Sequence, residues 1–192
     1  MLNTAIIYES KHHGNTKKLV EMARTNAVER LARESGRYAR EQKHLDELAA
    51  LLGLKEPPRI IESYDISNWG DGTSVAGMVV FEDGKPKKAG YRRFKMNTVA
   101  GTDDYASMAE TLARRAAEYE KGAKGQFGIK PDLLLIDGGR GQVSAVQAAL
   151  AGTQLADVPM FGMVKDDKHR TRALTTPAAQ AAPASFAAIP AS

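Results

Sequence analysis

The sequence of 192 residues contains no cysteine, which excludes disulfides, thiolate metal ligands and thiol nucleophiles together. This absence agrees with a reducing compartment, and we expect a cytoplasmic protein. The sequence also lacks an apolar run of the ~20 residues that a membrane-spanning helix needs. Residues 1–8 are apolar only briefly and carry no basic leader, so they do not have the pattern of a signal peptide.

Positive charge is present in modest excess, with a net charge of +4 and a pI of about 9.2. Lysine and arginine gather in three ranges, 24–43, 85–95 and 165–172. Any one such cluster is typical of a solvated face. Three clusters that border the same predicted domain favour a surface that binds a polyanion backbone.

The first third of the chain has a mainly helical pattern. Residues 4–8 predict a short buried strand, followed by a loop over 9–16. From Lys17 to Leu52 apolar residues recur at spacings of three and four, which predicts a long amphipathic helix interrupted near Ser35–Gly36. Gly53 is suited to end this helix and Pro57–Pro58 prevents its continuation, so we place a domain boundary at residue 57.

A compact α/β pattern follows the boundary. The predicted order is strand, hairpin, helix, strand, helix, strand, over residues 59–66, 74–81, 91–96, 102–120, 132–136, 142–150 and 158–164. This is the order of a ribonuclease H-like fold, a mixed sheet with flanking helices. Residues 175–192 are rich in alanine and proline and are predicted to form a loose tail.

Three aspartates stand where such a fold places ligand sites. Asp65 ends the first core strand, Asp137 ends the buried strand 133–136, and Asp104 lies in the first turn of the intervening helix. Carboxylates that converge there need a cation between them, and Mg²⁺ or Mn²⁺ takes oxygen ligands and activates water for phosphodiester chemistry. Two alternatives remain open: Asp104 as a helix-capping acid and Asp137 as a turn residue.

Two loops beside these acids are less specific. Gly138–Gly141 matches neither the Walker pattern nor the full dinucleotide fingerprint, and we expect its glycines to let a substrate backbone approach Asp137. His169 in the charged loop 165–170 could transfer a proton, or could simply be an exposed histidine.

With these residues in place, the chain from 19 to 174 resembles the UvrC family, excinucleases of bacterial nucleotide excision repair. The resemblance rests on residues 61–68, 77–81 with 84–86, 91–94, 103–108, 131–142 and 165–170. It implies a ribonuclease H-like endonuclease domain that makes the 5′ incision at a lesion, with DNA and the UvrB–DNA complex as partners. The catalytic residues would be Asp65, Asp104 and Asp137, with the metal on Asp65 and Asp137 and phosphates on Arg140, Lys165 and Arg170.

Several parts of that family have no counterpart in this sequence. These are the later motif with the catalytic histidine, the tandem helix-hairpin-helix module, the GIY-YIG nuclease domain and the segment that contacts UvrB. We therefore expect a truncated domain, over residues 57–174 after a helical linker at 19–56. An inactive nucleic-acid-binding remnant is an alternative interpretation.

The first 18 residues resemble the strand and phosphate loop of flavodoxins. In that family the loop, here with Ser10, Asn15 and Thr16, would hold the phosphate of a flavin mononucleotide. This resemblance implies a second alternative, an electron-transfer protein. An incidental strand-loop-helix start is the simpler interpretation of the same residues.

Overall fold

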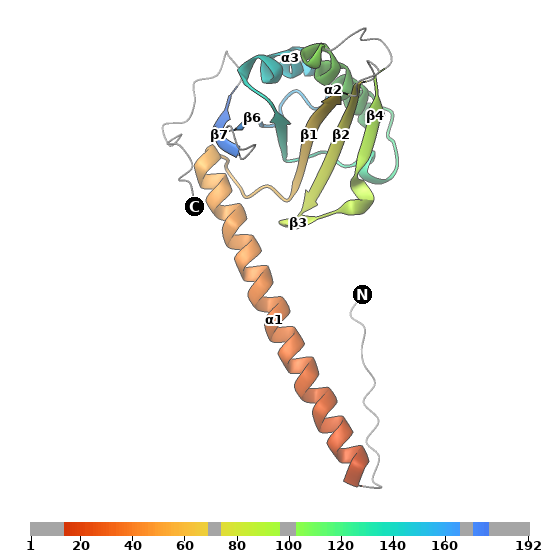
Figure 1. Cartoon of the computed structure of the whole chain (residues 1–192), viewed down its shortest axis with the longest axis vertical. Coiled ribbons are helices and arrows are strands. Elements are labelled where there is room, and N and C mark those ends of the chain that lie inside the picture. The colour runs from red at the N-terminus through yellow and green to blue at the C-terminus, as the bar shows by residue number, and fades with distance from the viewer. Residues whose placement is uncertain (1–13, 69–73, 97–102, 166–170, 177–192) are drawn as a thin grey trace. The chain divides into compact units, whose positions relative to one another are not determined.

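The computed structural model describes residues 14–68, 74–96, 103–165 and 171–176 (Figure 1). The chain divides into two compact units, residues 1–43 and 44–192. The elements, in chain order, are α1 (Gly14–Leu52), β1 (Ile60–Asn68), β2 (Ser74–Glu82), β3 (Lys85–Pro86), the 3-10 turn η1 (Lys88–Gly90), β4 (Arg92–Lys95), α2 (Asp104–Glu120), η2 (Gly125–Gly128), β5 (Leu133–Asp137), α3 (Arg140–Leu150), β6 (Met160–Lys165) and β7 (Thr171–Thr175).

Helix α1 is continuous across Ser35–Gly36, so the predicted interruption is wrong. A glycine inside a helix costs about 1 kcal/mol relative to alanine, which a long helix tolerates. Ion pairs four residues apart add local support, among them Arg30 with Glu34 and Arg33 with Glu29, each at 3.2 Å. The apolar residues of this stretch are not covered by the described residues, since Met22 is 61% and Leu31 66% exposed.

The last turns of α1 differ from the rest because they are packed. Leu45 and Leu52 are buried in a cluster with Ile61, Leu133 and Phe161. The second compact unit accordingly begins at His44, inside the segment predicted to be a linker. The helix ends at Leu52 as expected, and Gly53 adopts the positive φ of 65° that favours glycine at a helix C-terminus.

The sheet has the predicted mixed topology. Within the described residues the strand order is β3-β2-β1-β5-β6-β7, and β4 also pairs with β2. Strands β1 and β2 form an antiparallel hairpin, while β5 and β6 add in parallel to β1 and to β5 respectively. The almost continuous apolar run of β5 is what a central parallel strand needs, because it is covered on both faces. The order expected of a ribonuclease H-like fold is therefore confirmed.

Alternation along the strands sorts side chains between the two faces of the sheet. Tyr64 of β1, Met78 of β2 and Ile136 of β5 belong to the main core with Leu112 of α2 and Val143 of α3. Helices α2 and α3 thus cover one face, where Figure 1 shows them together over the strands. The opposite face is covered near Ile61 by the end of α1. We refer to this second face as the outer face.

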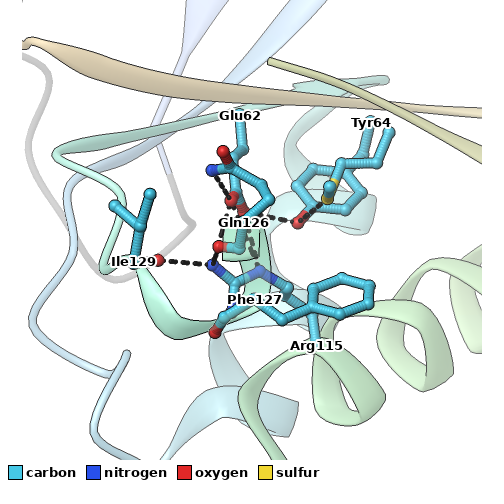
Figure 2. Close-up of polar contacts among 7 residues, drawn as sticks. Glu62, Tyr64, Arg115, Gln126, Phe127 and Ile129 are labelled. Carbon is cyan, nitrogen blue, oxygen red and sulfur yellow. Dashed lines mark hydrogen bonds and ion pairs between the residues drawn. The ribbon is translucent and has the colours of Figure 1, made fainter. Parts of the chain in front are cut away.

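A fully buried polar network joins α2 to β1. The guanidinium of Arg115 donates to both carboxylate oxygens of Glu62, at 2.9 and 3.1 Å, and both side chains are 0% exposed. Arg115 also donates to the carbonyl oxygens of Phe127 and Ile129, at 2.9 and 2.6 Å. Figure 2 shows Glu62 and Ile129 on either side of the Arg115 guanidinium. The network satisfies a buried charge pair that would otherwise be costly.

Two hydrogen bonds complete the environment of the Glu62 carboxylate. The Tyr64 hydroxyl donates to it at 2.7 Å and the Gln126 amide at 3.1 Å. Burial raises the pKa of Tyr64 well above its usual value, and the neighbouring Glu62 raises it further. The tyrosine therefore remains a hydrogen-bond donor to Glu62 throughout the ordinary pH range.

Strand β7 was not predicted from the sequence. It pairs antiparallel with β6 and runs through Thr175, where the sequence had predicted the start of a tail. Its five residues include only two apolar side chains, too few for a periodicity to show. Among the described residues, no helix is both long and apolar enough to cross a membrane.

Candidate active site

Asp65 and Asp137 lie side by side on two neighbouring parallel strands, where the pairing of β1 with β5 ends. Asp137 ends β5, but β1 continues to Asn68, so the prediction that Asp65 ends its strand is wrong. Tyr64 of β1 is in register with Ile136 of β5, so the next residue on each strand is an aspartate. Both follow a residue of the main core, and alternation therefore directs both side chains to the outer face. The structure thus brings together two of the three predicted acids.

The electrostatics of Asp65 reflect this proximity. Its pKa is raised, first by partial burial and then by a hydrogen bond with, and the charge of, Asp137. The charge of Lys165 acts in the opposite direction and lowers this pKa. A pair of carboxylates that disfavours full ionisation in the absence of a cation is suited to bind one.

Lys165, at the end of β6, supplies a positive charge at this point. Its ammonium group forms an ion pair with Asp137, whose side chain is 14% exposed. The hydrogen bond to Asp137 raises the pKa of Lys165, with a smaller contribution from the charge of Asp65. The sequence predicted a phosphate contact for Lys165 and gave no sign of this pair. The pair depends on β6 lying next to β5, which sequence spacing does not reveal.

Asp104 occupies a different position. Asp103, not Asp104, is the N-cap of α2, and its carboxylate accepts a hydrogen bond from the amide of Ala106 at 3.0 Å. The first turn of α2 lies against the start of α3. The distance from the Tyr105 ring to a β carbon built on Gly141, which would be 3.1 Å, shows this contact. This contact places Asp104 at the end of the molecule where Asp137 lies. No group of three acids or histidines positioned to hold a metal occurs among the described residues.

Side chains of the protein itself lie over part of the glycine turn that follows Asp137. A β carbon on Gly138 would lie 1.5 Å from Oε1 of Gln142, and this same oxygen accepts a hydrogen bond from the amide of Gly139 at 3.1 Å. Gln142 and Tyr105 thus lie over Gly138 and Gly141, whereas a β carbon on Gly139 would meet no atom within 4 Å, and the expectation that these glycines admit a substrate backbone stays a prediction. Arg140 is the first residue of α3 and is exposed.

Some of the predicted residues lie outside the described residues or are described only in part. Arg170 and His169 fall in the segment 166–170, and Ser10 falls in 1–13. Asn15 and Thr16 belong to the first turn of α1, so the loop predicted over 9–16 ends earlier than expected.

Comparison with known proteins points to one family. Residues 49–187 match the family model of the UvrC RNase H endonuclease domain. The UvrABC system protein C of Acetivibrio thermocellus is 43% identical over 181 residues, covering 85% of this chain and 29% of that protein. Its counterpart in Clostridioides difficile is 46% identical over 165 residues, covering 84% and 26%. This chain thus spans less than a third of the length of these relatives.

Solved structures also show likenesses, with low scores. Endonuclease V of Ciona intestinalis, bound to a DNA that contains inosine, aligns with a TM-score of 0.43 at 13% identity, covering 72% of this chain and 59% of that one. Human ENDOV aligns with a TM-score of 0.42 at 18% identity, covering 68% and 59%.

Proposed function

The chain belongs to the UvrC RNase H endonuclease domain family, and from this we propose that it is a metal-dependent DNA endonuclease domain of nucleotide excision repair. One observation carries the proposal: Asp65 and Asp137 lie on adjacent parallel strands, each directly after the register pair Tyr64 and Ile136, and both face the same side of the sheet. Paired carboxylates at strand ends are a ligand arrangement that hard divalent cations prefer.

The residues of the site fit a divalent metal. Asp65 and Asp137 would hold it, with Asp104 in support, and Mg²⁺ or Mn²⁺ is the ion that such oxygen ligands favour. The ammonium group of Lys165 now supplies the positive charge that Asp137 requires. When bound, such a metal lowers the pKa of a water and stabilises charge on a phosphodiester.

The surroundings of the carboxylates supply positive charge for DNA. Arg140 is exposed at the N-terminus of α3, where the helix dipole adds to its attraction for a phosphate. Lys165 lies beside Asp137 and is 41% exposed at its side chain. We propose that Arg140 and Lys165, together with Arg170, contact phosphates of the substrate strand.

The position of the cut and the partner belong to the proposal as well. The family resemblance implies that the domain makes the incision on the 5′ side of a lesion, with a UvrB–DNA complex as its partner. Because this chain spans 26–29% of its relatives, these properties of the longer proteins extend to it as expectations.

The decisive experiment measures nicking of supercoiled or lesion-containing DNA with Mn²⁺. We expect the full chain to nick, and Asp65→Asn to lower the rate by about 10²-fold or more, because an amide is a poorer ligand than a carboxylate. Asp157→Asn is the matched control, since Asp157 is an exposed aspartate paired with Lys130. Equal rates for wild type and Asp65→Asn would contradict the metal site. Inactivity of both, with DNA binding retained, would support the inactive remnant.

A further inference from the structure

A row of residues crosses the outer face at the level of Asp65. Gly77 of β2 is in register with Asp65 on one side and with Arg93 of β4 on the other. On the other side of Asp65 lies β5, where Asp137 comes directly after Ile136, the register partner of Tyr64. The row therefore reads Arg93, Gly77, Asp65, Asp137 across β4, β2, β1 and β5.

All four side-chain positions point to the same face. On β4 the neighbouring Phe94 is buried in the main core beneath α2 and α3. On β2 the neighbours of Gly77, Ala76 and Met78, are buried in that same core. Since side chains alternate along a strand, Arg93 and Gly77 face outward with Asp65.

Gly77 leaves the surface between Arg93 and Asp65 open. A β carbon built on it would meet no atom within 4 Å. Strands lie about 4.8 Å apart, so two steps put the backbone of Arg93 about 10 Å from that of Asp65. An extended arginine can cover most of this distance, and no side chain stands between. We call the surface over Gly77 the glycine lane.

Arg93 has a guanidinium available for a ligand, unlike its neighbours. Arg92 donates to the carbonyl oxygens of Ala89 and Tyr91, at 2.8 and 2.7 Å, and Arg114 donates to that of Lys95 at 2.7 Å. Arg93 is exposed and forms no hydrogen bond or ion pair with the described residues.

We propose that Arg93 binds a backbone phosphate of the DNA strand, reaching across the glycine lane to a position next to the one held at Asp65 and Asp137. This inference rests on the proposed nuclease function and adds a substrate-binding residue to it. Arginine suits the task because its planar guanidinium contacts two phosphate oxygens at once. A side chain at residue 77 would obstruct the strand, and glycine removes the obstacle.

The test is the equilibrium binding of a fluorescein-labelled DNA duplex to the full chain without divalent metal, over a series of salt concentrations. We expect Arg93→Ala to weaken binding by about 3- to 10-fold and to reduce the slope of log K against log salt by about one contact. Gly77→Val should weaken binding without removing charge, and it should fold, because its space is open and valine favours strands.

Lys124→Ala is the control for lost charge alone, since Lys124 is exposed beside η2, which packs against the core on the other face of the sheet. Its binding should stay within about 1.5-fold of wild type. The double variant Arg93→Ala with Gly77→Val should be no weaker than the worse single variant, because both remove one contact. Equal effects of Arg93→Ala and Lys124→Ala, or wild-type binding by Gly77→Val, would overturn the inference. Absence of DNA binding by wild type would instead overturn the proposed function.

Discussion

The protonation behaviour of single residues on the outer face depends on neighbours that are distant in the sequence. Asp65 is an ordinary strand residue in the sequence, yet Asp137 beside it and partial burial raise its pKa. Asp157, by contrast, has its pKa lowered, first by the hydrogen bond from Lys130. Two aspartates of one chain therefore respond to pH in opposite senses, which makes them a matched pair.

We predict that Asp65→Asn increases the free energy of unfolding at neutral pH, by less than about 1 kcal/mol because solvent screens the site. A raised folded pKa means that ionising Asp65 costs stability as pH rises through that pKa. The gain from Asn should thus vanish as the pH falls below the ordinary pKa of aspartate. Chemical denaturation of both proteins at several pH values measures this difference.

The control variant Asp157→Asn should have the opposite sign. A lowered folded pKa contributes stability above the ordinary pKa, and that stability is lost as pH falls. Its loss at neutral pH should be small, because the pair with Lys130 is exposed. Destabilisation of the Asp65→Asn protein at neutral pH would show that Asp65 is not under repulsion.

At the scale of elements, the buried pair of Glu62 and Arg115 holds α2 on β1. Periodicity and capping residues predicted α2 and β1 correctly, because both signals are local. Nothing local distinguished Arg115 from Arg114, the half-buried arginine beside it in the same helix. Its role depends on Glu62, 53 residues earlier, and on the carbonyl oxygens of η2.

We predict that Glu62→Gln destabilises the fold by about 3–5 kcal/mol, because it leaves the Arg115 charge buried without a counter-charge. Adding Arg115→Met should restore part of that loss, since an apolar side chain removes the buried charge. Urea denaturation of the two single variants and the double variant gives the coupling energy. Glu118→Gln, which removes an exposed partner of Lys121, should change stability by less than about 0.5 kcal/mol. Similar effects of the two glutamate variants would contradict a buried pair.

At the scale of the whole molecule, the two units differ in how many of their side chains are buried. Residues 21–40 of α1 are exposed throughout, whereas α2 buries Met108, Leu112 and Ala116. Tertiary packing supplies most of the stability of a protein helix, and α1 has little of it before its last turns. The hydrophobic pattern in the sequence predicted that α1 is a helix, but not that its apolar residues stay uncovered.

We predict that amide hydrogens of residues 21–40 exchange with solvent faster than those of α2, by at least about tenfold. Local opening of an unpacked helix exposes little apolar surface, while opening α2 disrupts the main core. Native-state hydrogen exchange resolved by mass spectrometry compares the two helices within one sample. Residues 45–52 are an internal control, because Leu45 and Leu52 are packed and should be protected. Equal protection along all of α1 would show that its first part is packed as well.

The sequence by itself determined the order of most helices and strands, the parallel character of β5 and the position of Asp137 at the end of that strand. These follow from local periodicity, capping and turn residues. Only the tertiary structure decided that Lys165 pairs with Asp137, that Gln142 fills the space over Gly138, and that Gly77 lies between Arg93 and Asp65. Such contacts depend on strand register and helix docking, which are set by packing between segments distant in the sequence.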